Sequence, residues 1–94
     1  MDKRRKIPNT TQMRELRSEF YDRVQRGELT IFEAAKEMRK VSLMTQTEFA
    51  KHRQVSLKVI KDLENGTANP TMNTLNQVAE IFGLELGFVK KRSA

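Results

Sequence analysis

The chain has 94 residues, of which 18 are Lys or Arg and 12 are Asp or Glu, so its formal net charge is +6 at pH 7. This length fits one small domain, and the basic excess favours a polyanionic partner, nucleic acid before an anionic membrane. The chain contains no cysteine, which excludes disulfides and thiolate metal sites, and it contains no apolar run of the roughly 20 residues that a membrane span needs.

Residues 1–8 are expected to form a disordered basic arm, because four consecutive bases, Lys3–Lys6, are followed by Pro8. The arm could be solvated, could follow the phosphates of DNA, or could be attracted to a membrane surface. We expect no membrane partner, because no amphipathic apolar face accompanies these charges. A soluble protein of the cytoplasm fits this composition best.

Residues 9–29 are expected to contain a leading helix over about 10–26. Asn9 and Gln12 have the spacing of a capping pair, and Gly27 provides a stop. Between them the apolar residues recur at helical spacing. This apolar stripe is either part of the core or a surface for a dimer or another partner.

Residues 30–83 are expected to contain four further helices, each with its own start signal. Thr30 with Glu33 and Thr45 with Glu48 have the spacing of capping boxes. The expected helices cover about 31–41, 45–52, 57–65 and a last segment capped by Thr71 and closed by Gly83, and Ser56 is the expected N-cap of the third.

Residues 84–94 differ in pattern from the rest of the chain. Leu84, Leu86 and Phe88 alternate with other residues, which indicates a strand over Leu84–Lys90 followed by a basic tail. No other segment offers a convincing partner strand, so we expect the strand to pair with a second copy of the chain. An extended tail packed on the core is the alternative. The predicted fold is therefore an all-α bundle of about five helices with a short C-terminal β-strand.

The two short helices at 45–52 and 57–65, joined by a tight turn, have the layout of a DNA-reading element. Val55, Ile60 and Leu63 are expected to anchor it, which leaves four residues of the second helix facing outward. Lys58 can donate to guanine, and Leu57 can contact only a thymine methyl group. Asp62 either accepts from a cytosine amino group or pairs with Lys58 or Lys61.

This spacing resembles the Xre-type helix-turn-helix family, which includes the lambdoid phage repressors and many antitoxins. The matching residues cover a little over half of the chain: Thr45, Gln46, Glu48, Ala50, Val55, Ser56, Ile60, Glu64, Asn65, Gly66, Pro70, Thr74, Leu75, Ala79 and Gly83. The family turn usually has an apolar residue and then glycine before Val-Ser, where this chain has Arg53 and Gln54. Arg53 could reach a phosphate. Gln54 in a left-handed conformation would cost about 1–2 kcal/mol, and a reshaped turn is the alternative.

The resemblance also implies roles for individual residues. Gln46 and Ser56 would contact phosphates, and Leu57, Lys58 and Asp62 would lie where the family reads bases. Asn65 and a loop that begins at Thr67 would contact the second phosphate backbone. Glu64 would form a buried structural ion pair with Arg39.

The function expected from these features is that of a dimeric repressor of a palindromic operator. Within that class, the small size and the tail favour an antitoxin-like autoregulator, of the kind exemplified by HipB and HigA, with a cognate toxin protein as a possible partner. A free-standing phage or chromosomal regulator is the alternative within the class. The alternative is a protein-interaction module that does not bind DNA. No enzyme, cofactor or metal is expected, because Glu48 and His52 alone make no metal site and the chain contains no nucleophile elbow or glycine-rich phosphate loop.

Overall fold

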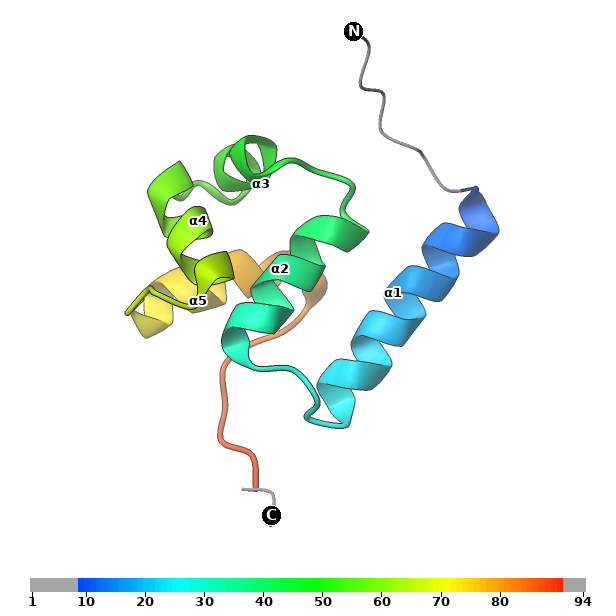
Figure 1. The fold of residues 1–94 in the computed structure, drawn as a ribbon. Coiled ribbons are helices and arrows are strands. Elements are labelled where there is room, and N and C mark those ends of the chain that lie inside the picture. The colour runs from blue at the N-terminus through cyan, green and yellow to red at the C-terminus, as the bar shows by residue number, and fades with distance from the viewer. Residues whose placement is uncertain (1–8, 91–94) are drawn as a thin grey trace, which may run out of the picture.

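The computed structural model describes residues 9–90, which form a bundle of helices (Figure 1). The basic arm expected over residues 1–8 and the end of the basic tail, residues 91–94, lie outside the described residues. The elements are α1 (Thr10–Gln25), α2 (Ile31–Val41), α3 (Gln46–Arg53), α4 (Leu57–Asn65), α5 (Met72–Ala79) and a short 3₁₀-helix, η1 (Glu80–Phe82).

All five α-helices begin with a side-chain cap, as the sequence predicted. Asn9, Thr30 and Thr45 each form a complete capping box with the Gln or Glu three residues later. Ser56 accepts a hydrogen bond from the backbone N–H of Val59, and Thr71 accepts one from that of Thr74. Such a cap stabilises a helix by about 1 kcal/mol, so much of the helix pattern is specified locally.

The core lies where α2, α3, α4 and α5 meet. Its largest fully buried side chains are Phe49, Ile60, Leu63 and Val78, which come from α3, α4 and α5. Helix α2 adds apolar residues at helical spacing, which are Ala35, Met38 and Val41. These helices are too short to be stable in isolation, so their mutual packing holds the fold together.

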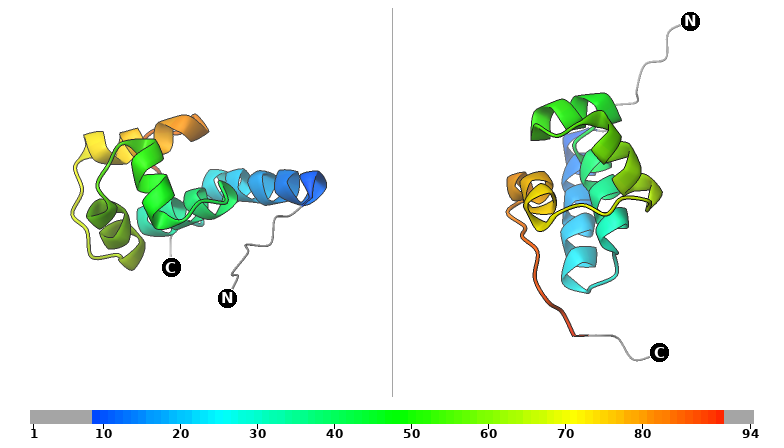
Figure 2. Two further views of the ribbon diagram at one scale, coloured as in Figure 1. Left: turned by 90° about the horizontal axis from the view of Figure 1, so that it is seen from above. Right: turned by 90° about the vertical axis from the view of Figure 1, so that its left-hand side faces the viewer.

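Helix α1 packs on the domain mainly toward its C-terminal end, where its buried residue, Phe20, lies. Phe20 is 2% exposed and meets the rings of Tyr21 and Phe82 edge to face, with centroid separations of 5.4 and 5.7 Å. The Tyr21 hydroxyl also donates to the carbonyl of Phe82 at 2.8 Å. Toward the N-terminal end, which projects beyond the bundle in the left view of Figure 2, Leu16 is 44% exposed. Part of the predicted apolar stripe is therefore core, and part is surface.

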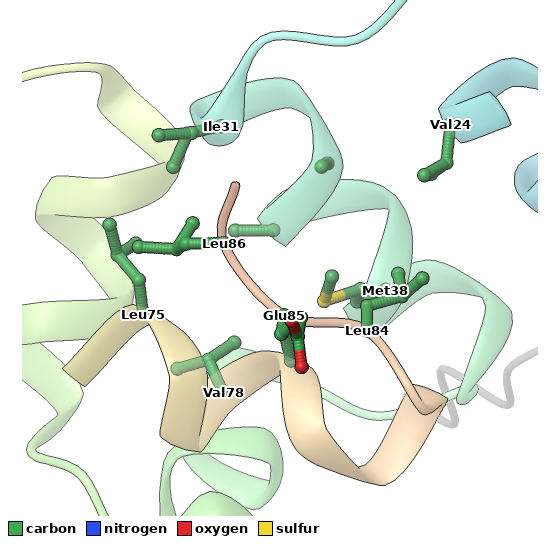
Figure 3. A pocket seen from close by; sticks show the side chains of 11 residues that line it. Val24, Ile31, Met38, Leu75, Val78, Leu84, Glu85 and Leu86 are labelled. Carbon is green, nitrogen blue, oxygen red and sulfur yellow. The ribbon is translucent and has the colours of Figure 1, made fainter. Parts of the chain in front are cut away.

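The segment expected to be a strand, residues 84–90, forms none in the described chain. Leu84 packs against the core, and the backbone N–H of Leu86 donates to Oδ1 of Asn76 at 2.9 Å. Both leucines line an apolar pocket of about 140 Å³ with residues such as Val24, Ile31 and Leu75 (Figure 3). No strand forms because no described backbone lies beside this segment to pair with it.

Phe88 and Val89 lie beyond that pocket and face solvent. Their exposed fractions are the highest of the large apolar residues among those described, 107% for Phe88 and 83% for Val89. The C-terminal segment is thus divided into an anchored part and an exposed apolar part.

Candidate nucleic-acid interface

The turn between α3 and α4 keeps a tight geometry without glycine. Gln54 adopts the left-handed conformation, with φ 59° and ψ 41°, which is one of the two alternatives considered for this turn. The backbone N–H of Val55 then donates to the carbonyl of Ala50 at 3.0 Å, which closes the end of α3. This turn sets the direction in which α4 leaves.

Arg53 does not reach toward a phosphate, and that expectation was wrong. The residue is 8% exposed, and its guanidinium donates to the carbonyl of Gln77 and to the carboxylate of Glu80. The reason is its phase on α3: Arg53 shares the buried side of the helix with Phe49 and Ala50, so its side chain turns toward α5.

Helix α4 has one apolar face and one polar face. Ile60 and Leu63 are buried, whereas Lys58, Lys61 and Asn65 are exposed on the other side. Leu57 is half-buried and packs against the core, so the expectation that it faces outward was wrong. Its position three residues before Ile60 places the two side chains on the same face of the helix.

Asp62 pairs with Lys58 in the free chain. The Nζ of Lys58 lies 2.7 Å from Oδ2 of Asp62, one helical turn away, and the two side chains are 83% and 33% exposed. Of the roles considered for Asp62, the ion pair is the one present. An exposed pair of this kind stabilises the helix only slightly, and the lysine remains accessible to an anion.

Two of the predicted phosphate contacts lie at the N-terminal ends of the motif helices. The Ser56 hydroxyl oxygen accepts from Val59 N–H at 3.1 Å, so the hydroxyl hydrogen is what it can offer to a phosphate. Gln46 is half-buried, and its amide nitrogen donates to Oε1 of Glu64 at 3.2 Å. One amide hydrogen of Gln46 is therefore already engaged, and the second is the one suited to a phosphate.

The other predicted phosphate contacts lie after α4. Asn65 is exposed at its last turn, and Gly66 ends the helix in the left-handed conformation, φ 71°. Thr67 is exposed, and both its N–H and its hydroxyl donate to the carbonyl of Asp62, at 3.0 and 3.4 Å. The start of the loop is thereby held against the last turn of α4.

The ion pair predicted between Arg39 and Glu64 is present. Nε and Nη2 of Arg39 donate to the two carboxylate oxygens of Glu64 at 2.6 and 2.9 Å, and Nη1 donates to the carbonyl of Met44 at 3.1 Å. The side chains are 19% and 5% exposed. The hydrogen bonds that Arg39 donates to Glu64 raise the pKa of Arg39, and partial burial opposes that rise. With Gln46 on the same carboxylate, this cluster joins α2, α3 and α4.

Two features of the motif could not be predicted from the sequence: the backbone conformation of Leu43 and the contacts of Gln77. Leu43, in the connection from α2 to α3, adopts a left-handed conformation with φ 57°. Gln77 on α5 contacts the α3–α4 turn through both its side chain and its carbonyl. Neither residue type is characteristic of these roles, so only the three-dimensional contacts identify them.

The described residues contain neither a metal site nor a membrane span. Among residues 9–90, no group of three or more His, Asp or Glu side chains could hold a metal ion. In the same range, no helix combines the length and the apolar character required to cross a bilayer.

Two short helices with a tight turn, the second bearing exposed lysines, define a helix-turn-helix module of the kind used by DNA-binding regulators. A family model described as helix-turn-helix matches residues 36–89, more than half of the chain. The chain therefore belongs to the helix-turn-helix family, a family of DNA-binding regulators rather than of enzymes. No curated protein and no solved structure matches it. Helix α1 lies wholly outside the matched residues.

Proposed function

We propose that the chain is a homodimeric, sequence-specific repressor that places α4 in the major groove of a palindromic operator. The observation that carries this proposal is the polar face of α4, where Lys58 and Lys61 are exposed while Ile60 and Leu63 anchor the opposite face. The net charge of +6 favours approach to DNA. In a two-fold dimer, the two α4 helices would enter half-sites about 34 Å apart.

In this proposal the side chains of the motif divide into two groups. Lys58 reads a guanine through O6 and N7, and Asp62 orients it from one turn away. Gln46, Ser56, Asn65 and Thr67 contact phosphates on either side of the groove and fix the register of α4. Leu57 contributes chiefly to the packing of α4 on the core.

Lys58→Ala is expected to relax the base preference at one operator position. An operator is first selected from a random duplex pool with the wild-type protein, and affinities for it and its single-base variants are then measured by fluorescence anisotropy. We expect the loss of about 1–3 kcal/mol of discrimination at that position. The wild-type affinity should fall with salt with a log–log slope of about −0.9 per phosphate contacted.

Arg14→Ala is the matched control, because Arg14 is also exposed but lies on α1, and α1 and α4 lie on opposite sides of α2 in Figure 1. A further arm uses Asp62→Asn, which removes a negative charge and releases Lys58 from its pair. It should raise affinity for DNA in general and weaken the discrimination at the base that Lys58 reads, because Lys58 is then no longer oriented. If the wild-type protein selects no duplex even at low salt, the repressor proposal fails and the protein-interaction alternative gains support.

Dimerisation through the C-terminal segment is the second part of the proposal. It is supported by Phe88 and Val89, which are apolar and exposed on a segment that lies outside the helices. We expect the double variant Phe88→Ser/Val89→Ser to be a monomer where the wild type is a dimer. Sedimentation velocity over a range of protein concentrations measures this directly.

Substitution is a sharper test than truncation, because Leu84 packs on its own core and Leu86 bonds to Asn76. Removal of residues 84–94 would damage the monomer as well as the interface. Met72→Ser, at a residue that is 69% exposed on α5, is the matched control and should leave the mass unchanged. A double variant that stays dimeric would show that the copies associate elsewhere.

An antitoxin role is a narrower form of the same proposal. It is supported by the small size of the chain and by the likeness of the segment from Gly83 to Leu86 to the tails of antitoxins that are partnered with HipA-type kinases. A toxin gene in the neighbouring reading frame, and a complex of the two products that represses their shared promoter, would support this role.

A further inference from the structure

The end of α3 is held by a residue of α5. The amide nitrogen of Gln77 donates to the carbonyls of Arg53 and Gln54, at 2.8 and 3.1 Å. In return, Nε and Nη2 of Arg53 donate to the carbonyl of Gln77, at 3.1 and 2.7 Å. We call these four hydrogen bonds the turn clamp.

The turn clamp satisfies groups that a helix cannot satisfy itself. The last carbonyls of an α-helix have no partner within the helix, and Arg53 and Gln54 are the last residue and the C-cap of α3. Glycine usually occupies a left-handed C-terminal position because it has no Cβ. Here the position is Gln54, φ 59°, and the side chain of Gln77 bonds to its carbonyl directly.

The turn clamp lies between the two helices of the motif, next to the N-terminal end of α4. In the proposed function, this end of α4 reads the bases. Only Val55 and the N-cap Ser56 separate Gln54 from α4, so the direction of the turn sets the position of the first turn of that helix. The buried anchors Ile60, Leu63 and Glu64 hold the middle and the end of α4. In helix-turn-helix proteins the N-terminal residues of the second helix contact base edges.

We infer that Gln77 is a positioning residue for DNA recognition, acting through the left-handed turn at Gln54 to set how α4 presents Lys58. Gln77 lies on α5 and touches the turn rather than the polar face of α4. Its effect is therefore indirect and passes through the backbone of the turn. This inference rests on the proposed DNA-binding function.

Gln77→Met tests the inference, because methionine keeps the length of the side chain and removes both donors. We expect affinity for the selected operator to fall about tenfold, as for the loss of one or two hydrogen bonds. Affinity is measured well below the midpoint of thermal unfolding, where circular dichroism shows the variant to be folded. In a Gln77→Met/Gln54→Gly variant the affinity should recover, since glycine adopts the left-handed turn without the clamp.

Glu80→Gln is the control, because it removes the charge that pairs with Arg53 at 2.9 Å and leaves the turn clamp intact. Its affinity should lie within about twofold of the wild type or above it, since the substitution adds no repulsion to DNA. Folded Gln77→Met with wild-type affinity would overturn the inference, and so would a loss that Gln54→Gly does not restore. If the wild-type protein binds no DNA, the proposed function fails instead, so the two failures are distinguishable.

Discussion

Arg39→Met is expected to lower the free energy of unfolding by about 3–5 kcal/mol, the usual cost of removing one partner from a buried ion pair. The substitution keeps much of the volume of the arginine but leaves the Glu64 carboxylate, 5% exposed, with the amide of Gln46 as its remaining partner in the cluster. For a chain of this size such a loss is a large fraction of total stability. Urea unfolding followed by circular dichroism measures it.

The double variant Arg39→Met/Glu64→Leu separates the loss of the pair from the cost of a stranded charge. It leaves no unpaired charge in the core, so we expect it to recover most of the lost stability. Recovery would show that the pair serves chiefly to satisfy a buried carboxylate. If the single variant is as stable as the wild type, the carboxylate must be hydrated and the pair is not structural.

Phe20→Ala is expected to destabilise the chain by about 3–5 kcal/mol, as for other buried aromatic residues replaced by alanine. Phe20 is 2% exposed and packs edge to face with Phe82, so its loss would leave a cavity between α1 and η1. The expected result is a fall in the urea midpoint with cooperative unfolding retained. It would show that α1, which lies outside the matched residues 36–89, is part of the stable domain.

Two further substitutions on α1 serve as comparisons for Phe20→Ala, and both are expected to cost less stability. Tyr21→Phe removes the hydrogen bond to the carbonyl of Phe82 and should cost about 1 kcal/mol. Leu16→Ala, at a residue 44% exposed, should have a small effect. If Phe20→Ala is no more damaging than Leu16→Ala, α1 does not contribute to the core and is free to serve another partner.

Most of the helix pattern could be predicted because its determinants are local. A cap such as Thr30 and its partner Glu33 lie within a single helical turn, and Gly66 marks the end of α4 by its left-handed backbone. The pair between Arg39 and Glu64 could be predicted only through family resemblance, since 25 residues separate the two. Its presence reflects the packing of α2 against α4.

The predictions for Arg53 and Leu57 were wrong because the orientation of both side chains depends on how the helices pack. Arg53 is a basic residue in a DNA-binding motif, yet its place on the buried side of α3 turns it toward α5. Leu57 opens α4, and its side chain covers the core instead of the polar face. The residue type alone does not show whether such a side chain is buried or faces outward. The side of a short helix that is buried is set by the helices that pack against it.

The C-terminal segment could not be assigned from its alternating pattern alone. The same alternation suits a strand and an extended segment with one face on the core, and Leu84 and Leu86 take the second form in the described chain. Whether Phe88 pairs with a second copy depends on a partner that the pattern does not specify. The oligomeric states of the wild type and of the Phe88→Ser/Val89→Ser variant, measured by sedimentation velocity, therefore test whether the segment pairs.

The separate N-terminal caps have a practical consequence for protein engineering. Because Ser56 fixes the start of α4 and Gly66 its end, the exposed positions between them can be varied without shifting the frame of the helix. A library randomised at Lys58, Lys61 and Asp62 would keep the anchors Ile60 and Leu63 and change only the polar face of α4. Under the proposed function, such a library is suited to the selection of variants that bind new DNA sequences.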